Sequence, residues 1–135
     1  MDRYREYKEQ SVLMMTPGEQ LVLLYDETIK SFHRAEIFLE DAEYEMFEDE
    51  MKHARDVIRY LNRILDREQP ISGELENLYN FLLMNIGKVL AGRERKKEEI
   101  SSMVDIVTEI RDGFQAVISQ GEKLQGGTDD RKVFG

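Results

Sequence analysis

The sequence contains no cysteine, and it has only two prolines and two histidines among its 135 residues. The absence of cysteine excludes disulfide bonds, zinc sites made from thiolates and a cysteine nucleophile. The prolines stand at positions 17 and 70, and no stretch alternates apolar and polar residues for long. The sequence therefore predicts an all-α fold.

Long apolar runs and an excess of basic residues are also missing. No apolar run approaches the roughly 20 residues that cross a bilayer, and the first ten residues are too polar for a signal peptide. The chain has 28 acidic and 19 basic residues, which gives a net charge of −9. An acidic protein lacks the field that attracts phosphate backbones or anionic lipids. We therefore expect a cytoplasmic protein that binds no nucleic acid and does not insert into a membrane.

The chain is instead rich in apolar residues at helical spacing. Four helices are expected, over about residues 17–41, 47–67, 72–90 and 97–119. Because the links between them are short, successive helices should alternate in direction and form an antiparallel four-helix bundle. The bundle should span residues 16–120, with residues 1–15 forming an N-terminal arm or short helix. Residues 121–135 combine glycine and charge without periodicity, and we expect them to be disordered.

One face of each expected helix collects apolar residues at intervals of three and four. The residues expected in the core are Leu21, Leu24, Tyr25, Thr28, Phe32, Ala35 and Leu39; Phe47, Met51, Ala54, Ile58, Leu61 and Leu65; Leu75, Leu78, Tyr79, Leu82, Ile86 and Val89; and Ile100, Met103, Val107, Ile110, Phe114 and Val117.

The strongest local signal is Thr16-Pro17-Gly18-Glu19, which has the form of a capping box. A threonine at the N-cap can accept a hydrogen bond from the amide of the N3 residue, and a glutamate at N3 can reach back to the N-cap amide. Proline at the first helical position already has the backbone angle that a helix requires. The first helix is therefore expected to begin at Pro17.

Some apolar residues do not fit the core faces. At 100° per residue, Leu23 lies about 200° and Ile37 about 160° away from Leu21. On the third helix, Phe81 lies about 240° and Met84 about 180° away from Leu75. Three interpretations remain open: ordinary exposed apolar residues, a surface that residues 11–15 cover within the monomer, or a groove for an amphipathic partner helix. A mobile arm could also cover such a groove until a partner displaces it.

The sequence offers few residues for a chemical site. Glu50 and His53 have the spacing of a ferritin-like metal motif, but a second such motif is missing because His33 has Lys30 three residues before it. Asp26 could be a buried general base, or a carboxylate bonded to a neighbouring helix or to the arm. No combination of nucleophile, base and oxyanion site is evident. We therefore expect no enzyme activity, no cofactor and no metal.

Several motifs together resemble the FliS family of flagellar export chaperones. They are Tyr7 and Val12, then Thr16-Pro17-Gly18-Glu19-Gln20-Leu21, Leu24-Tyr25-Asp26 and Arg34-Ala35, and later Leu65-Asp66, Leu78-Tyr79 and Ile110-Arg111-Asp112-Gly113-Phe114. The resemblance covers about residues 4–120.

The resemblance implies a cytoplasmic chaperone that binds the C-terminal region of flagellin and prevents its premature polymerisation. Such chaperones deliver flagellin to the flagellar export apparatus, and other export or regulatory proteins are possible partners. The resemblance also implies an N-terminal segment that moves when flagellin binds. The residues expected to contact the partner are Tyr7, Val12, Leu13, Leu23, Tyr25, Asp26, Ile37, Phe81 and Met84. The alternatives are a self-associating structural bundle or a ferritin-like metal-binding protein.

Overall fold

The computed structural model describes residues 14–128, with side chains described as far as Gly121. Its elements are α2 (Pro17–Glu40), α3 (Tyr44–Arg63), α4 (Ser72–Gly92), the 3₁₀ helix η1 (Arg93–Lys96) and α5 (Lys97–Thr128). The described part of the chain is thus all-α, as predicted. Within this part, no helix is long and apolar enough to cross a membrane.

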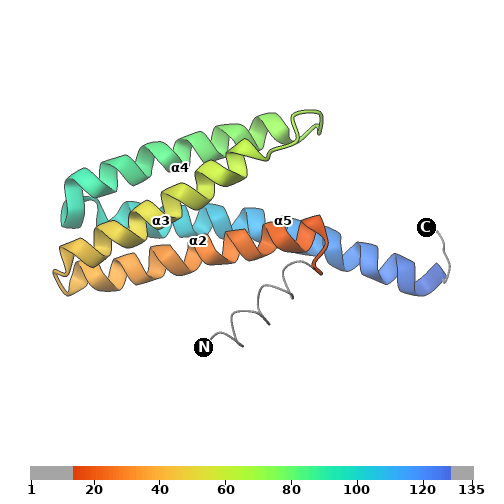
Figure 1. Cartoon of the computed structure of the whole chain (residues 1–135), viewed down its shortest axis with the longest axis horizontal. Helices are drawn as coiled ribbons and strands as arrows, with labels where there is room; N and C mark the ends of the chain where they lie inside the picture. Colours follow the sequence, from red (N-terminus) through yellow and green to blue (C-terminus); the bar gives the residue numbers. More distant parts are fainter. Residues whose placement is uncertain (1–13, 129–135) are drawn as a thin grey trace.

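The four α-helices run alternately up and down and form an antiparallel bundle (Figure 1). The helix α2 packs most closely against α3 and α5, while α4 completes the ring by contacting α3 and α5. The buried residues of α2 and α3 include small ones, namely Ser31 and Ala35 on α2 and Ala54 on α3. The prediction of an antiparallel four-helix bundle is confirmed.

The start of α2 has the predicted capping box. The amide of Glu19 donates to Thr16 Oγ1 at 3.2 Å, and the amide of Thr16 donates to Glu19 Oε1 at 2.9 Å. The amides at the start of an α-helix have no carbonyl partner within the helix. The capping box gives two of them, those of Thr16 and Glu19, a hydrogen-bond partner. Pro17 occupies the first helical position, as predicted.

Two helices, α3 and α5, differ clearly in their bounds from the prediction. The helix α3 covers residues 44–63 rather than 47–67, because residues 64–71 form turns held by bonds such as Gln69 N–H to Asp66 C=O at 3.2 Å. The helix α5 continues to Thr128 although we predicted disorder from residue 121. A helix propagates one hydrogen bond per residue without needing an apolar partner, and each glycine weakens it by only about 1 kcal/mol. Residues 129–135 lie outside the described part.

The two ends of the bundle differ in how tightly the helices are held. We call the end with the α2–α3 turn and η1 the closed end. There Tyr44 Oη donates to Glu94 at 2.5 Å, Lys97 Nζ lies 3.0 Å from Glu40, and the Arg93 guanidinium stacks on the Tyr44 ring at 4.1 Å. These contacts join the two turns to each other. The opposite end, with the start of α2, the loop 64–71 and the start of α4, is called the open end.

Candidate functional site

The core becomes incomplete toward the open end. Several residues that we predicted to be in the core are only partly buried there: Leu21, Leu24, Leu65, Leu78, Ile110 and Phe114. Val117 was predicted to join them but is 66% exposed. In Figure 1, α4 stands away from α2 at this end, and α5 continues past all other helices. The helices therefore leave apolar side chains there without enough neighbours to cover them.

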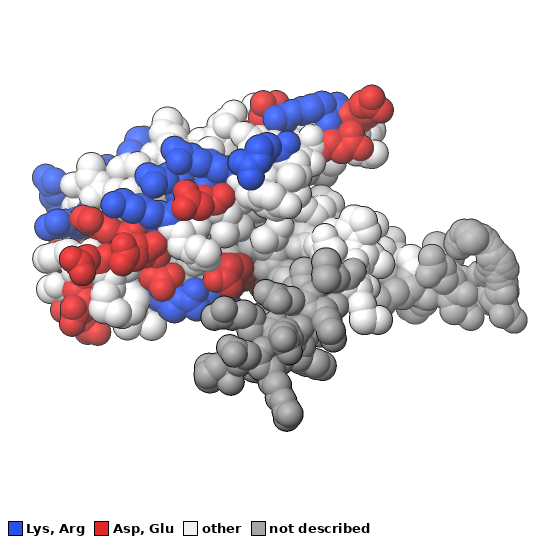
Figure 2. Space-filling view, viewed as in Figure 1, with Lys and Arg blue, Asp and Glu red and all other residues white. Residues whose placement is uncertain are grey.

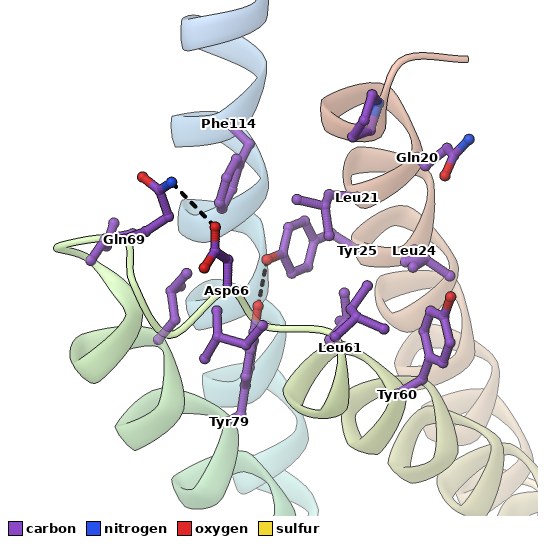
Figure 3. Close-up of a pocket in the computed structure, with 15 residues that line it drawn as sticks. Gln20, Leu21, Leu24, Tyr25, Tyr60, Leu61, Asp66, Gln69, Tyr79 and Phe114 are labelled. Carbon is purple, nitrogen blue, oxygen red and sulfur yellow. Dashed lines mark hydrogen bonds between the residues drawn. The ribbon is translucent and has the colours of Figure 1, made fainter. Parts of the chain in front are cut away.

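A cavity of about 400 Å³ lies between α2, α3, the loop 64–71 and α4 (Figure 3). Its inner wall is aromatic: the hydroxyls of Tyr25 and Tyr79 are hydrogen-bonded at 2.6 Å, and the Phe114 ring stacks on Tyr25 with 5.7 Å between ring centroids. Leu21, Leu24, Leu61, Ile64 and Leu65 provide most of its aliphatic lining. The cavity is suited to apolar side chains, because its buried polar atoms already have partners.

The tyrosine pair is held in its neutral form. Burial raises the pKa of Tyr25 above its usual range, and the neighbouring Tyr79 raises it further. Burial also raises the pKa of Tyr79, although the hydrogen bond with Tyr25 acts in the opposite direction. A charged phenolate would lose its hydration in this wall. The pair therefore positions α2 against α4 and offers no acid or base for chemistry near neutral pH.

A second cavity of about 610 Å³ opens between α4 and α5. It has an apolar lining that includes Ile71, Leu78, Ile106, Ile110 and Val117, and it also contacts Glu74 and Glu109. It shares Gln69, Ile71, Leu75 and Phe114 with the first cavity. The two cavities therefore adjoin and form one apolar surface, which we call the open-end groove.

A shallower hollow of about 250 Å³ lies between α2 and α5 on another side of the bundle. It is lined by Leu23, Val22, Ile118 and Met15, among others, and by Asp26. The Arg111 guanidinium donates to Asp26 Oδ1 at 2.7 Å, and this bond raises the pKa of Arg111. Of the roles considered for Asp26, bonding to a neighbouring helix is the one observed.

The structure separates the sequence-predicted contact residues. Ile37 is 55%, Phe81 43% and Met84 53% exposed, so the helical wheel placed these side chains outside the core correctly. They do not form one patch, because Ile37 lies on α2 and the other two on α4, which are not neighbours in the ring. Leu23 is partly buried, and Tyr25 is only 1% exposed, at the wall of the first cavity.

Three of the predicted contact residues, Tyr7, Val12 and Leu13, lie outside the described residues. The assignment of all nine residues to partner binding stays a prediction.

Sequence reasoning missed the open-end groove and its exposed members Tyr60, Ile64 and Ile71. Two signals could have indicated it. Ile71 stands in an otherwise polar break beside Pro70, and the expected fourth helix places Val117 beyond the length of the expected third helix. Both signals concern the ends of helices. The periodicity of apolar residues along one helix does not show where a neighbouring helix ends.

The ferritin-like alternative finds no support among the described residues. No group of three or more potential metal ligands occurs in residues 14–128. Glu50 is bonded to Arg34 at 3.1 Å, and His53 Nε2 lies 3.0 Å from Glu27. Both side chains thus take part in a surface network that links α2 to α3.

Comparison with known proteins agrees with the sequence resemblance. The flagellar secretion chaperone FliS of Bacillus subtilis (strain 168) is 25% identical over 125 residues, which cover 93% of this chain and 92% of that protein. The solved structure titled "Crystal structure of flagellar chaperone from bacteria" superposes with a TM-score of 0.73 at 16% identity, covering 89% of this chain and 98% of that one. It supports the fold. The family model described as "Flagellar protein FliS" matches residues 1–121. This match covers most of the chain, and the protein belongs to the FliS family.

Proposed function

We propose that this protein is a cytoplasmic export chaperone for flagellin. It binds the C-terminal region of flagellin, prevents its premature polymerisation and delivers it to the flagellar export apparatus. Membership in the FliS family and a relative named as a flagellar secretion chaperone support this role. The observation that carries the proposal is the open-end groove, because its apolar lining exceeds what the bundle itself covers.

The groove is suited to an amphipathic helix. Such a helix inserts apolar anchors at positions i, i+3, i+4 and i+7 into a hydrophobic groove, and the two adjoining cavities offer space for several anchors. Phe81 follows Leu78 by three residues on α4 and is 43% exposed, so we expect a client helix that lies in the groove to contact it as well. A client segment that lies here has its apolar face covered. It is then unavailable for assembly into a filament.

The client must be ordered as it binds. A segment that folds on binding loses conformational entropy, which lowers the affinity per unit of buried area. A large contact surface compensates for this loss. We therefore assign the open-end groove as the main contact and expect Leu23, Ile37 and Met84 to contribute at the edges of a client that wraps around the bundle.

The first test is titration of the full chain with a flagellin C-terminal fragment. We expect a one-to-one complex, measured by calorimetry together with light scattering. Absence of binding at high concentrations of both proteins would refute the proposal. A self-associating structural bundle would instead remain an oligomer and bind no fragment.

Two single substitutions test the location of the contact. Phe81→Asp and Val117→Asp should each weaken binding of the fragment at least about tenfold, because each places a charge within a desolvated apolar contact. Both side chains are substantially exposed, so the melting temperature should change little. Met46→Asp is the matched control: Met46 is also exposed, at 47%, but it lies on α3 near the closed end. Equal weakening by all three variants would contradict the assignment.

A further inference from the structure

The outward face of α3 carries a continuous row of charged residues. We call this row the charged seam; its members are Glu45, Asp49, Lys52, Asp56, Arg59 and Arg63, and all are exposed. Their spacing alternates between four and three residues. Residues with this spacing stay on one face of a helix and can contact a partner helix along its whole length. At 100° per residue they fall within a band of about 80°. This band is on the side of α3 opposite its buried residues, such as Ala54 and Ile58.

The order of charges along the seam is self-complementary. Figure 2, viewed as Figure 1, shows acidic side chains gathered near the start of α3 and basic ones toward its end. Residue 54 is the centre of the seam: Glu45 and Arg63 are equally distant from it, as are Asp49 and Arg59. In an antiparallel pair of identical helices, residues equally distant from the centre face each other. Each of these pairs combines opposite charges.

The innermost pair shows the same complementarity. Lys52 and Asp56 are also equally distant from residue 54, and they too are opposite in charge. The dipole of a helix favours acidic residues near its start and basic residues near its end. It therefore accounts for the outer pairs, but not for a lysine that precedes an aspartate in the middle. All three pairs, by contrast, fit an antiparallel second copy.

Most seam charges have no partner within the described part of their own chain. Glu45, Asp49, Lys52 and Arg59 form no ion pair or side-chain hydrogen bond there. The nearest ion pair of Asp56 is a long one, 3.9 Å to Arg55. The surface between α2 and α3 is different, because there Arg34 bridges Glu27 and Glu50.

We propose that two copies of this protein associate through antiparallel contact of their charged seams, as a two-fold symmetric dimer. Such an interface is isologous, so each unlike pair occurs twice. No seam residue lines the open-end groove. The dimer therefore leaves both grooves accessible, and this proposal goes beyond client binding and does not depend on it.

The dimer should be weak and sensitive to salt. Pairs between exposed charges are individually weak, and they are screened once the Debye length falls to the distance between the charges. Sedimentation equilibrium of the full chain should show dimer in about 20 mM salt and mainly monomer in about 300 mM salt, with a dissociation constant at least tenfold higher.

Charge reversal identifies the interface. The variant Arg59→Glu/Arg63→Glu makes five of the six seam charges negative, and the variant Glu45→Arg/Asp49→Arg makes five of them positive. Each variant should be monomeric in low salt because like charges then face each other. An equimolar mixture of the two should form a dimer, because the altered seams are complementary to each other. Only contact between two seams predicts this rescue.

A control separates the seam from the effect of net charge. The variant Lys88→Glu/Arg95→Glu makes the same change in charge at exposed residues of α4 and η1, and it should dimerise like the unaltered chain. Thermal melting verifies that every variant is folded. The proposal is overturned if the unaltered chain stays monomeric in low salt at about 100 µM, a concentration at which even weak encounters are populated. It is equally overturned if the control loses the dimer as the seam variants do, or if the mixture remains monomeric.

Discussion

The hydrogen bond between Tyr25 and Tyr79 is the contact that joins α2 to α4 across the interior of the bundle. Both rings are almost fully buried, and Phe114 of α5 stacks on Tyr25. Three helices therefore meet at these rings, directly beneath the first cavity. A polar bond at this depth is favourable only while both hydroxyls keep their partner, because an unpaired buried hydroxyl costs about 1 to 3 kcal/mol.

Replacement of the two tyrosines should show this dependence at neutral pH. Tyr79→Phe alone should lower the free energy of unfolding by about 1 kcal/mol, because Tyr25 is then left without a partner. The double variant Tyr25→Phe/Tyr79→Phe should lose less than the sum of the two single variants. Urea unfolding of all four proteins measures the coupling. Additive losses would mean that the bond contributes nothing.

The same proteins should differ in alkali. Burial raises the folded-state pKa of both tyrosines above about 10, the value in an unfolded chain. The two tyrosines therefore contribute fully to the free energy of unfolding below about pH 10. Above that pH their contribution falls, because the tyrosines of the unfolded chain lose their protons at a lower pH than those of the folded chain. The melting temperature of the unaltered chain should decrease more steeply between about pH 9.5 and 11 than that of the double variant. Parallel curves would contradict this assignment.

At the scale of the elements, the helix starts and core faces were largely predictable from the sequence. The capping box at Thr16 locates the start of α2 because its signal is local. The buried faces follow from periodicity, and the following residues are buried where predicted: Phe32, Ala35, Leu39, Ile86, Val89, Ile100 and Met103. Phe81 and Met84 are exposed for the same reason, since their direction depends only on the helix to which they belong.

The open-end groove could not be predicted in this way. Whether Leu78, Ile110 and Phe114 are fully buried depends on how far α4 stands from α2 and α5, and that distance is a property of several helices together. Val117 illustrates the point: its position in the periodic pattern equals that of a core residue, yet it is 66% exposed at the edge of the second cavity, although the first turn of α2 packs beside the next residue, Ile118. The helical positions of the residues consequently predicted that the bundle has exposed apolar surface. They assigned this surface to scattered residues and not to the open-end groove.

The difference between the two ends should appear within α4 itself. Local opening requires least free energy where buried contacts are few. Backbone amides of residues 76–78, between the open end and the buried Tyr79, should therefore exchange hydrogen faster than those of residues 86–89, where Ile86 and Val89 are fully buried. Exchange measured residue by residue by NMR tests this. Uniform protection along α4 would show that the helix opens only as a unit.

At the scale of the whole molecule, the surface has separate regions: the open-end groove, the hollow beside Leu23 and the charged seam of α3. Residues 1–15 precede α2, whose first residues line the first cavity. We propose that residues 1–15 compete with a client for the groove. The family resemblance implied an N-terminal segment that moves when flagellin binds.

Removal of residues 1–15 tests this competition. If the arm competes, the shortened chain should bind the flagellin fragment at least as tightly as the full chain, measured by titration calorimetry. Weaker binding would show instead that the arm contributes contacts to the client. Because the deletion removes Met15 but keeps Thr16 and the capping box, the start of α2 should remain intact.

The length of α5 has a consequence for how this protein moves through solution. Its 32 residues span about 48 Å, whereas the 21 residues of α4 span only about 32 Å. A chain of 15.9 kDa with such a projection meets more friction than a sphere of equal mass and leaves a gel-filtration column early. An elution volume alone would overestimate its mass and could make one copy look like two. Its state of association must therefore be weighed by a method that does not depend on shape.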